Sequence, residues 1–163
     1  MQKVLQLRSE PLTVSEHEAL RVFGLTEESR PLTYIENNFE DKGEVIVDYA
    51  TGLMWQQSGS KAALAYNRAQ EYIEELNRQK FAGYDGWRLP TIPELMSLLE
   101  PQKRSNNLYI NPMFDDRQRL CWSADKCLSI KGLSESSWLV SFGLGLVPRD
   151  RRLDFSYVRG IRF

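Results

Sequence analysis

The sequence predicts an α+β fold with a hairpin, then two helices, then several antiparallel strands, and three observations lead to this prediction. Residues 61–80 repeat apolar side chains at helical spacing. A second helix start follows in the turn-rich stretch from Gly83 to Leu99. From Leu120 onward, short runs with β alternation are separated by turns. A chain whose strands are grouped before and after its helices is typical of a mixed fold with antiparallel strands.

Length and composition fit one domain with a small N-terminal appendage. The chain has 163 residues, of which 42% are hydrophobic and 26% charged, and these values are ordinary for a globular protein. The net charge of −1, from 21 basic and 22 acidic residues, argues against a nucleic-acid partner, which calls for a basic excess. We therefore divide the chain into an adapter segment, residues 1–43, and a domain, residues 44–163.

Two further expectations concern membranes and export. No apolar run approaches the roughly 20 residues that cross a bilayer, so we expect no membrane insertion. The first ten residues lack the apolar stretch of a secretion signal. As given, the chain is expected to be cytoplasmic, and to be exported if it is part of a longer protein.

Few side chains of this sequence could carry chemistry. His17 is the single histidine, and it is expected to be an exposed first-turn residue. Cys121 and Cys127 are expected to be reduced and packed, with a local disulfide and a paired redox or copper site as the alternatives. The adjacent Asp115 and Asp116 fit a solvated turn better than a metal site or an acid/base pair. With one histidine and no cysteine cluster, we expect no metal and no cofactor.

The first elements in chain order are a short helix and a hairpin. Ser15 and Glu18 have the spacing of a capping box, which predicts a helix through Phe23 that ends at Gly24. Residues 44–48 and 53–57 are short apolar runs on either side of a turn, and they predict a β-hairpin.

The helix over 61–80 has an apolar stripe that includes Ala69 and Ile73, and it is expected to pack on the sheet. On its polar side, Glu74 and Arg78 stand in the order that favours an i,i+4 ion pair. The next helix is expected to begin at Thr91, which forms a second capping box with Glu94.

Four strands are expected in the last third of the chain, over residues 120–124, 137–142, 144–147 and 157–163. Each of the four tryptophans is expected to be a core residue, because a buried ring removes a large apolar surface from water. Arg88 is expected to satisfy backbone carbonyls or a carboxylate beside Trp87, with Asp48 and Glu94 as the candidate partners.

These motifs, in this order, resemble the DUF1566 family, also called the Lcl C-terminal domain, over residues 44–163. The residues that carry the resemblance include Asp48, Thr51, Gly52, Trp55, Trp87, Arg88, Leu89, Pro90, Thr91, Glu94, Trp122 and Trp138. The resemblance implies a C-type-lectin-like fold, with two helices flanking a twisted antiparallel sheet, near the branch of the formylglycine-generating enzymes. It also implies bacterial relatives that include surface adhesins and the variable proteins of diversity-generating retroelements.

From the resemblance and the residues together, we expect a non-catalytic module that binds a protein or a surface ligand. Two stretches are candidates for the contact surface, residues 123–137 and 148–157. Within them, the candidate ligand-binding residues are Asp125, Lys126, Arg149, Asp150, Arg151, Arg152, Asp154, Phe155 and Tyr157. Arg and Tyr are favoured in protein contacts. The family often has Ser or Thr where this chain has Ala124 and Asp125, and an acidic residue at Ser141, so the class of ligand does not carry over. The calcium motifs of sugar-binding C-type lectins are absent.

Two alternatives stay open. One is a cysteine-dependent oxidase related to the formylglycine-generating enzymes, which would use Cys121 and Cys127. No histidine or basic cluster near them in the sequence would lower a thiol pKa. The other is an architectural module, in which residues 1–43 dock the domain onto a larger assembly or form a homo-oligomer.

Overall fold

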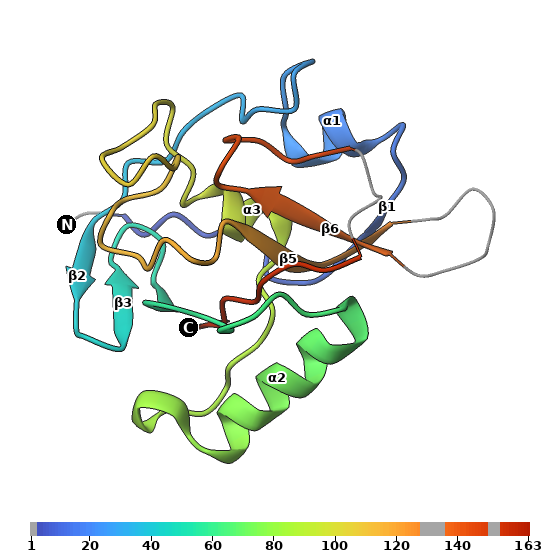
Figure 1. Ribbon diagram of the computed structural model, residues 1–163. Coiled ribbons are helices and arrows are strands. Elements are labelled where there is room, and N and C mark those ends of the chain that lie inside the picture. Colours follow the sequence, from blue (N-terminus) through green and yellow to red (C-terminus); the bar gives the residue numbers. More distant parts are fainter. Residues whose placement is uncertain (1–2, 128–135, 150–153) are drawn as a thin grey trace.

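The computed structural model describes residues 3–127, 136–149 and 154–163, and it is a mixed α+β structure (Figure 1). Within these residues the strands form two sheets, one with strand order β2-β3-β4-β7 and one with strand order β1-β5-β6. The helices are α1 (Ala19–Phe23), α2 (Tyr66–Arg78) and α3 (Ile92–Met96), with a 3-10 turn, η1 (Phe81–Gly83), after α2.

The first sheet contains the predicted hairpin. β3 (Val45–Asp48) and β4 (Leu53–Gln56) pair antiparallel, with Ile46 opposite Trp55. β2 (Phe39–Asp41) adds to the β3 edge and β7 (Ile161–Arg162) to the β4 edge, both antiparallel. The hairpin was predicted from its local pattern, whereas β7 joins it from the far end of the chain.

The second sheet joins the two ends of the chain. β5 (Leu120–Cys127) pairs antiparallel with β6 (Ser136–Ser141), and β1 (Thr13–Val14) pairs parallel with the end of β5. The predicted strand over 120–124 is thus too short by three residues. The predicted strand over 144–147 is wrong, because these residues form a turn with a single bridge from Leu146 back to Ser141. Of the strand predicted over 157–163, only β7 belongs to a ladder.

The helices differ from the prediction at their starts. α2 begins at Tyr66 rather than at residue 61, because the backbone of Leu64 pairs with Ser156 and holds Ala65 extended. The stripe itself is as predicted, with Ala69, Ile73 and Leu76 buried. The expected ion pair between Glu74 and Arg78 is not formed, since Arg78 pairs with Glu75.

The two predicted capping boxes have different outcomes. At α3, Thr91 accepts from the Glu94 N–H, and the Glu94 carboxylate accepts from the Thr91 N–H, so the box is present. At α1 the box is absent: Ser15 donates to the Glu18 carboxylate across a turn, and the helix begins only at Ala19. Gly24 ends α1 in the left-handed conformation, as predicted.

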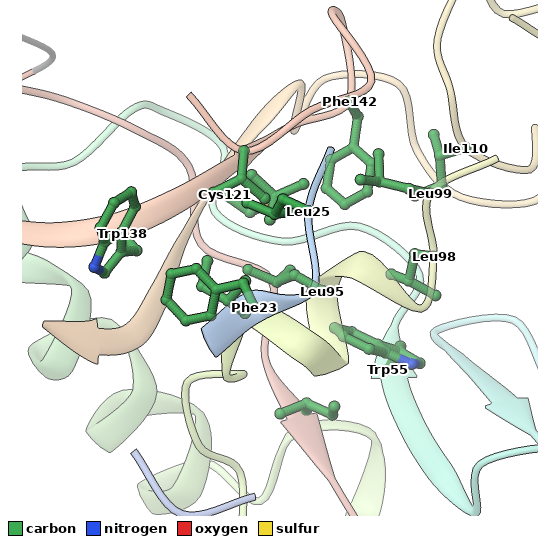
Figure 2. Close-up of a cluster of buried hydrophobic side chains, with 14 of the residues drawn as sticks. Phe23, Leu25, Trp55, Leu95, Leu98, Leu99, Ile110, Cys121, Trp138 and Phe142 are labelled. Carbon is green, nitrogen blue, oxygen red and sulfur yellow. The ribbon is translucent and has the colours of Figure 1, made fainter. Parts of the chain in front are cut away.

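One large apolar cluster lies between the sheets and α3, and residues before 44 belong to it. Phe23 packs its ring edge against Trp138 at a centroid distance of 5.2 Å, and the two lie side by side in Figure 2. Val14 and Leu25 are buried in the same cluster as Trp55. A second cluster, beneath α2, includes Trp87 and Trp122. The packing therefore shows no break at residue 43, where the sequence suggested the end of an adapter.

Candidate functional site

The stretch from Trp87 to Glu94 is a rigid part of the scaffold. The Asn77 side chain accepts from the Trp87 N–H at 2.7 Å and donates to the Trp87 carbonyl at 2.9 Å. The Trp87 ring N–H donates to the Tyr84 carbonyl at 3.0 Å. One side chain of α2 thus holds the backbone of an extended segment in place, and Trp87 itself is buried.

Of the two candidate partners for Arg88, the structure selects Glu94. Both terminal nitrogens of Arg88 donate to the Glu94 carboxylate, at 2.7 and 2.6 Å, and Glu94 is fully buried. This fork-to-fork pair is the strong geometry for arginine and carboxylate. It neutralises Arg88 and fixes its guanidinium plane at the surface of the molecule.

Asp48 organises the hairpin turn instead. Its carboxylate accepts from the N–H groups of Asn38 and Ala50, from the Asn37 amide and from the Thr51 hydroxyl. Gly52, at φ +74°, closes that turn. The motif residues Asp48, Thr51 and Gly52 are therefore held by contacts within the fold.

Asp125 does not lie in an exposed loop, which corrects its assignment as a ligand-binding residue. It belongs to β5, it is fully buried, and its carboxylate receives four donors. Arg8 donates two of them, at 2.8 and 2.9 Å, and the N–H groups of Leu12 and Ile92 donate the others, each at 2.8 Å. The residue joins the N-terminal segment, α3 and β5, and no oxygen is left for a ligand.

The other candidate residues that the structure describes differ in their exposure and contacts. Arg149 is exposed and donates to the Glu27 carbonyl in the loop after α1. Tyr157 is half-buried beside β5, where its N–H donates to the Leu120 carbonyl. Asp154, Phe155 and Lys126 are exposed. Asp150, Arg151 and Arg152 lie outside the described residues, as does the stretch between β5 and β6, residues 128–135.

Of the side chains that an enzyme could use, the two cysteines are packed inside the fold. Cys121 and Cys127 are free thiols and both are buried. Burial raises the pKa of Cys121 to about 11, although the Arg159 guanidinium beside it acts in the opposite direction. A thiol with a raised pKa is a poor nucleophile at neutral pH. His17 is exposed in the turn before α1. Within the described residues, no group of three His, Cys, Asp or Glu side chains could hold a metal ion.

Arg159 is a buried residue whose role the sequence analysis missed. It belongs to the closing stretch 157–162, and the alternation there suggested that it faces away from the buried Val158, yet both residues are fully buried. Its guanidinium donates to the carbonyls of Gln56, Gln57 and Asp115 and to the Gln118 side chain. Burial lowers its pKa. It ties the C-terminal stretch to the residues after β4.

Two clefts are lined in part by the N-terminal segment and by Phe163. The larger, of about 500 Å³, is lined by residues 9–11, by Gln70, Glu74 and other residues of α2, by residues 87–89, and by Ala124 and Phe163. The smaller, of about 290 Å³, is lined by Val4, Gln6 and Leu7, by the turn at residues 51–53, and again by Phe163. Neither cleft could be read from the sequence, because their linings combine segments from both ends of the chain.

The family found by comparison is the one that the sequence motifs resemble. The profile of the Lcl C-terminal domain matches residues 44–162. Comparison with curated proteins and with solved structures found no match. In the part of the chain that the structure describes, no helix is both long and apolar enough to span a bilayer. Because the profile covers most of the chain and its motif residues build the hairpin turn, the capped helix and the buried tryptophans, the chain belongs to the Lcl C-terminal domain family.

Proposed function

We propose that this member of the family is a non-catalytic protein-binding module on a C-type-lectin-like scaffold, with Phe155 and Tyr157 in its contact surface. The observation that carries the proposal is an exposed aromatic ring on a tightly held backbone. Phe155 is 59% exposed, while the next residue, Ser156, exchanges two backbone hydrogen bonds with Leu64, at 2.8 and 3.0 Å.

The neighbouring backbone is held in the same way. The Tyr157 N–H donates to Leu120 and the Trp122 N–H donates to the Tyr157 carbonyl, each at 2.9 Å. The Val158 N–H donates to the Ser60 hydroxyl at 2.9 Å. Because this segment is already ordered, covering Phe155 with a partner would cost little conformational entropy, and a low cost favours affinity. Aromatic residues are also the commonest anchors of protein interfaces.

The positions of the reactive groups favour binding over catalysis. The carboxylates of Asp125 and Glu94 are saturated with donors from the chain itself, and the Cys121 thiol is buried with a raised pKa. These contacts support a scaffold role for both carboxylates and for Cys121, one of the two thiols that an oxidase would use. The N-terminal segment buries Val14, Phe23 and Leu25 in the core that it shares with the rest of the chain, which supports a scaffold role for that part of it.

The test compares two exposed apolar residues at different places on the surface. Phe155→Ala removes the proposed anchor, and Leu144→Ala, at a residue that is 60% exposed in a turn after β6, is the matched control. We expect quantitative affinity capture from the source organism to give a partner that wild type and Leu144→Ala retain and that Phe155→Ala loses. Purified partner should then bind Phe155→Ala at least about 10-fold more weakly, the scale of an interface anchor. A partner set that is identical for all three proteins would reject this surface.

A further inference from the structure

The larger cleft is a groove with excess negative charge, and Arg88 does not cancel this charge. Arg88 lines the groove, but both of its terminal nitrogens are engaged by Glu94. Glu10 and Glu74 also line the groove, and they come from the N-terminal segment and from α2. Both are exposed, and neither has an ion-pair partner among the described residues. The groove therefore presents two carboxylates with no cation of the described chain to balance them.

The remainder of the lining mixes polar and apolar side chains. Ile73, Leu89 and Ala124 are among the apolar ones, together with Phe163. Phe163 is 69% exposed, and its ring centroid lies 4.8 Å from the guanidinium carbon of Arg88. The paired arginine thus supports the ring from one side, while most of the ring remains in contact with water.

Phe163 also lines the smaller cleft, so the two clefts adjoin at this ring. The smaller cleft is more apolar in character, with Val4, Leu7 and Leu53 in its lining. Val4 is itself exposed. A ligand that crosses Phe163 would meet two carboxylates in one cleft and aliphatic side chains in the other.

We propose that the two clefts dock an extended segment of a partner protein that carries a Lys or Arg near an apolar residue. The cation would lie in the groove near Glu10 and Glu74, and the apolar side chain would lie across Phe163 in the smaller cleft. Charge complementarity selects the basic residue, because a cation in the groove has two free carboxylates to pair with and an acidic residue would be repelled. The aromatic ring adds a face on which the stem of a Lys or Arg can pack. This surface is distinct from Phe155, so the inference does not rest on the proposed function.

The probe for this inference is a library of random 12-residue peptides displayed on phage and selected on the full chain. We expect the enriched peptides to carry Lys or Arg near an apolar residue. A labelled synthetic peptide from the selection should bind Glu74→Gln and Glu10→Gln about 2–5-fold more weakly than wild type, as for partly exposed ion pairs. Glu74→Lys should weaken binding further, and the affinity for wild type should fall as salt is raised.

Two controls test whether the peptide binds in the groove. Glu71→Gln changes an exposed α2 carboxylate that pairs with Arg68 and does not line the groove, so it should leave peptide affinity unchanged. Amide chemical shifts should move at Gln70, Glu74 and Phe163 when the peptide binds, and should not move at Phe155.

Several results would overturn the proposal. These are a selection that enriches no peptide, enriched peptides without basic residues, or binding that is indifferent to Glu10 and Glu74. A dimer in solution that Glu74→Lys dissociates would assign the clefts to a second copy of this chain and would also overturn it. Because the capture experiment on Phe155 does not involve these residues, each proposal can fail without the other.

Discussion

Asp125 illustrates how one buried carboxylate can join segments that are far apart in the sequence. It accepts two hydrogen bonds from Arg8 and one each from the N–H groups of Leu12 and Ile92. Arg8 is three-quarters buried at this pair. Arg8 precedes the matched residues 44–162, so this pair joins β5 to a segment outside the family match.

We expect Asp125→Ala to lower the free energy of unfolding by about 3–5 kcal/mol, because it leaves Arg8 and two backbone donors without their acceptor. Asp116→Ala, at an exposed aspartate, should change it by less than about 0.5 kcal/mol. Urea denaturation followed by tryptophan fluorescence measures both. If Asp125→Ala unfolds at the wild-type midpoint, the carboxylate does not connect these segments.

The raised pKa of Cys121 predicts that the folded protein loses stability in alkaline solution. Burial raises its pKa from 9.0 to about 11, so the folded protein holds the thiol proton more tightly than the unfolded chain does. The stability that the folded protein gains by holding this proton is fully present below pH 9 and is lost as the pH rises through about 11. It amounts to about 2–3 kcal/mol at most.

The measurement is the slope of unfolding free energy against pH between 8 and roughly 10.5 in wild type and in Cys121→Ala. Burial also raises the pKa of Tyr72, so part of the decline is common to both proteins and only the difference in slope reports Cys121. A steeper decline in wild type is expected. Parallel slopes would mean that the thiol is solvated in the folded state.

At the scale of elements, the two capping boxes provide a matched pair of substitutions. Thr91→Ala removes a side chain that accepts from the Glu94 N–H and donates to the Arg8 carbonyl at 2.7 Å. It should cost about 1–2 kcal/mol of stability. Ser15→Ala should cost less than about 0.5 kcal/mol, since Ser15 bonds only to the Glu18 side chain and caps no helix. Equal costs in thermal unfolding would show that sequence spacing, and not the observed geometry, determines the effect.

The elements that the sequence predicted correctly are those set by local patterns. The hairpin of β3 and β4, the α3 cap and the stripe of α2 follow from local patterns, and the structure contains all three. β1 has two residues and gains its pairing only from β5, more than a hundred residues later. Asp125 was assigned to a contact surface because the predicted strand ended at residue 124, whereas β5 continues to Cys127 through an irregular register between Trp122 and Lys126. Such non-local pairings carry no periodic pattern.

At the scale of the whole molecule, the candidate surfaces were only partly within reach of the sequence. Phe155 and Tyr157 stood in a stretch of mixed charge and aromatic residues, and that composition could be recognised. The groove could not, because Glu10, Glu74 and Phe163 become neighbours only when the N-terminal segment, α2 and the end of the chain pack together. The charge of the groove is also hidden in the sequence, since it depends on Arg88 being neutralised by Glu94.

The packing of the N-terminal segment leads to a prediction about the matched family region alone. Residues before 44 supply α1, β1 and β2, and Val14 accepts a hydrogen bond from the Trp138 ring N–H at 3.0 Å. Phe23 covers the same tryptophan, and Phe39 packs its ring edge against Phe114 at 5.3 Å. Removing residues 1–43 would therefore expose Trp138 and leave β3 as an unpaired edge.

We expect residues 44–163 alone to lose the near-ultraviolet circular dichroism of packed tryptophans and to unfold without a cooperative transition. Phe23→Ala in the full chain is the graded comparison, and it should retain a cooperative transition while losing about 3–4 kcal/mol of stability. Both proteins are compared with wild type by circular dichroism during thermal unfolding. A cooperative transition near the wild-type temperature for residues 44–163 would instead make the first 43 residues an adapter, as their sequence suggested. It would mean that the contacts of Val14 and Phe23 with Trp138 add little to the stability of the core.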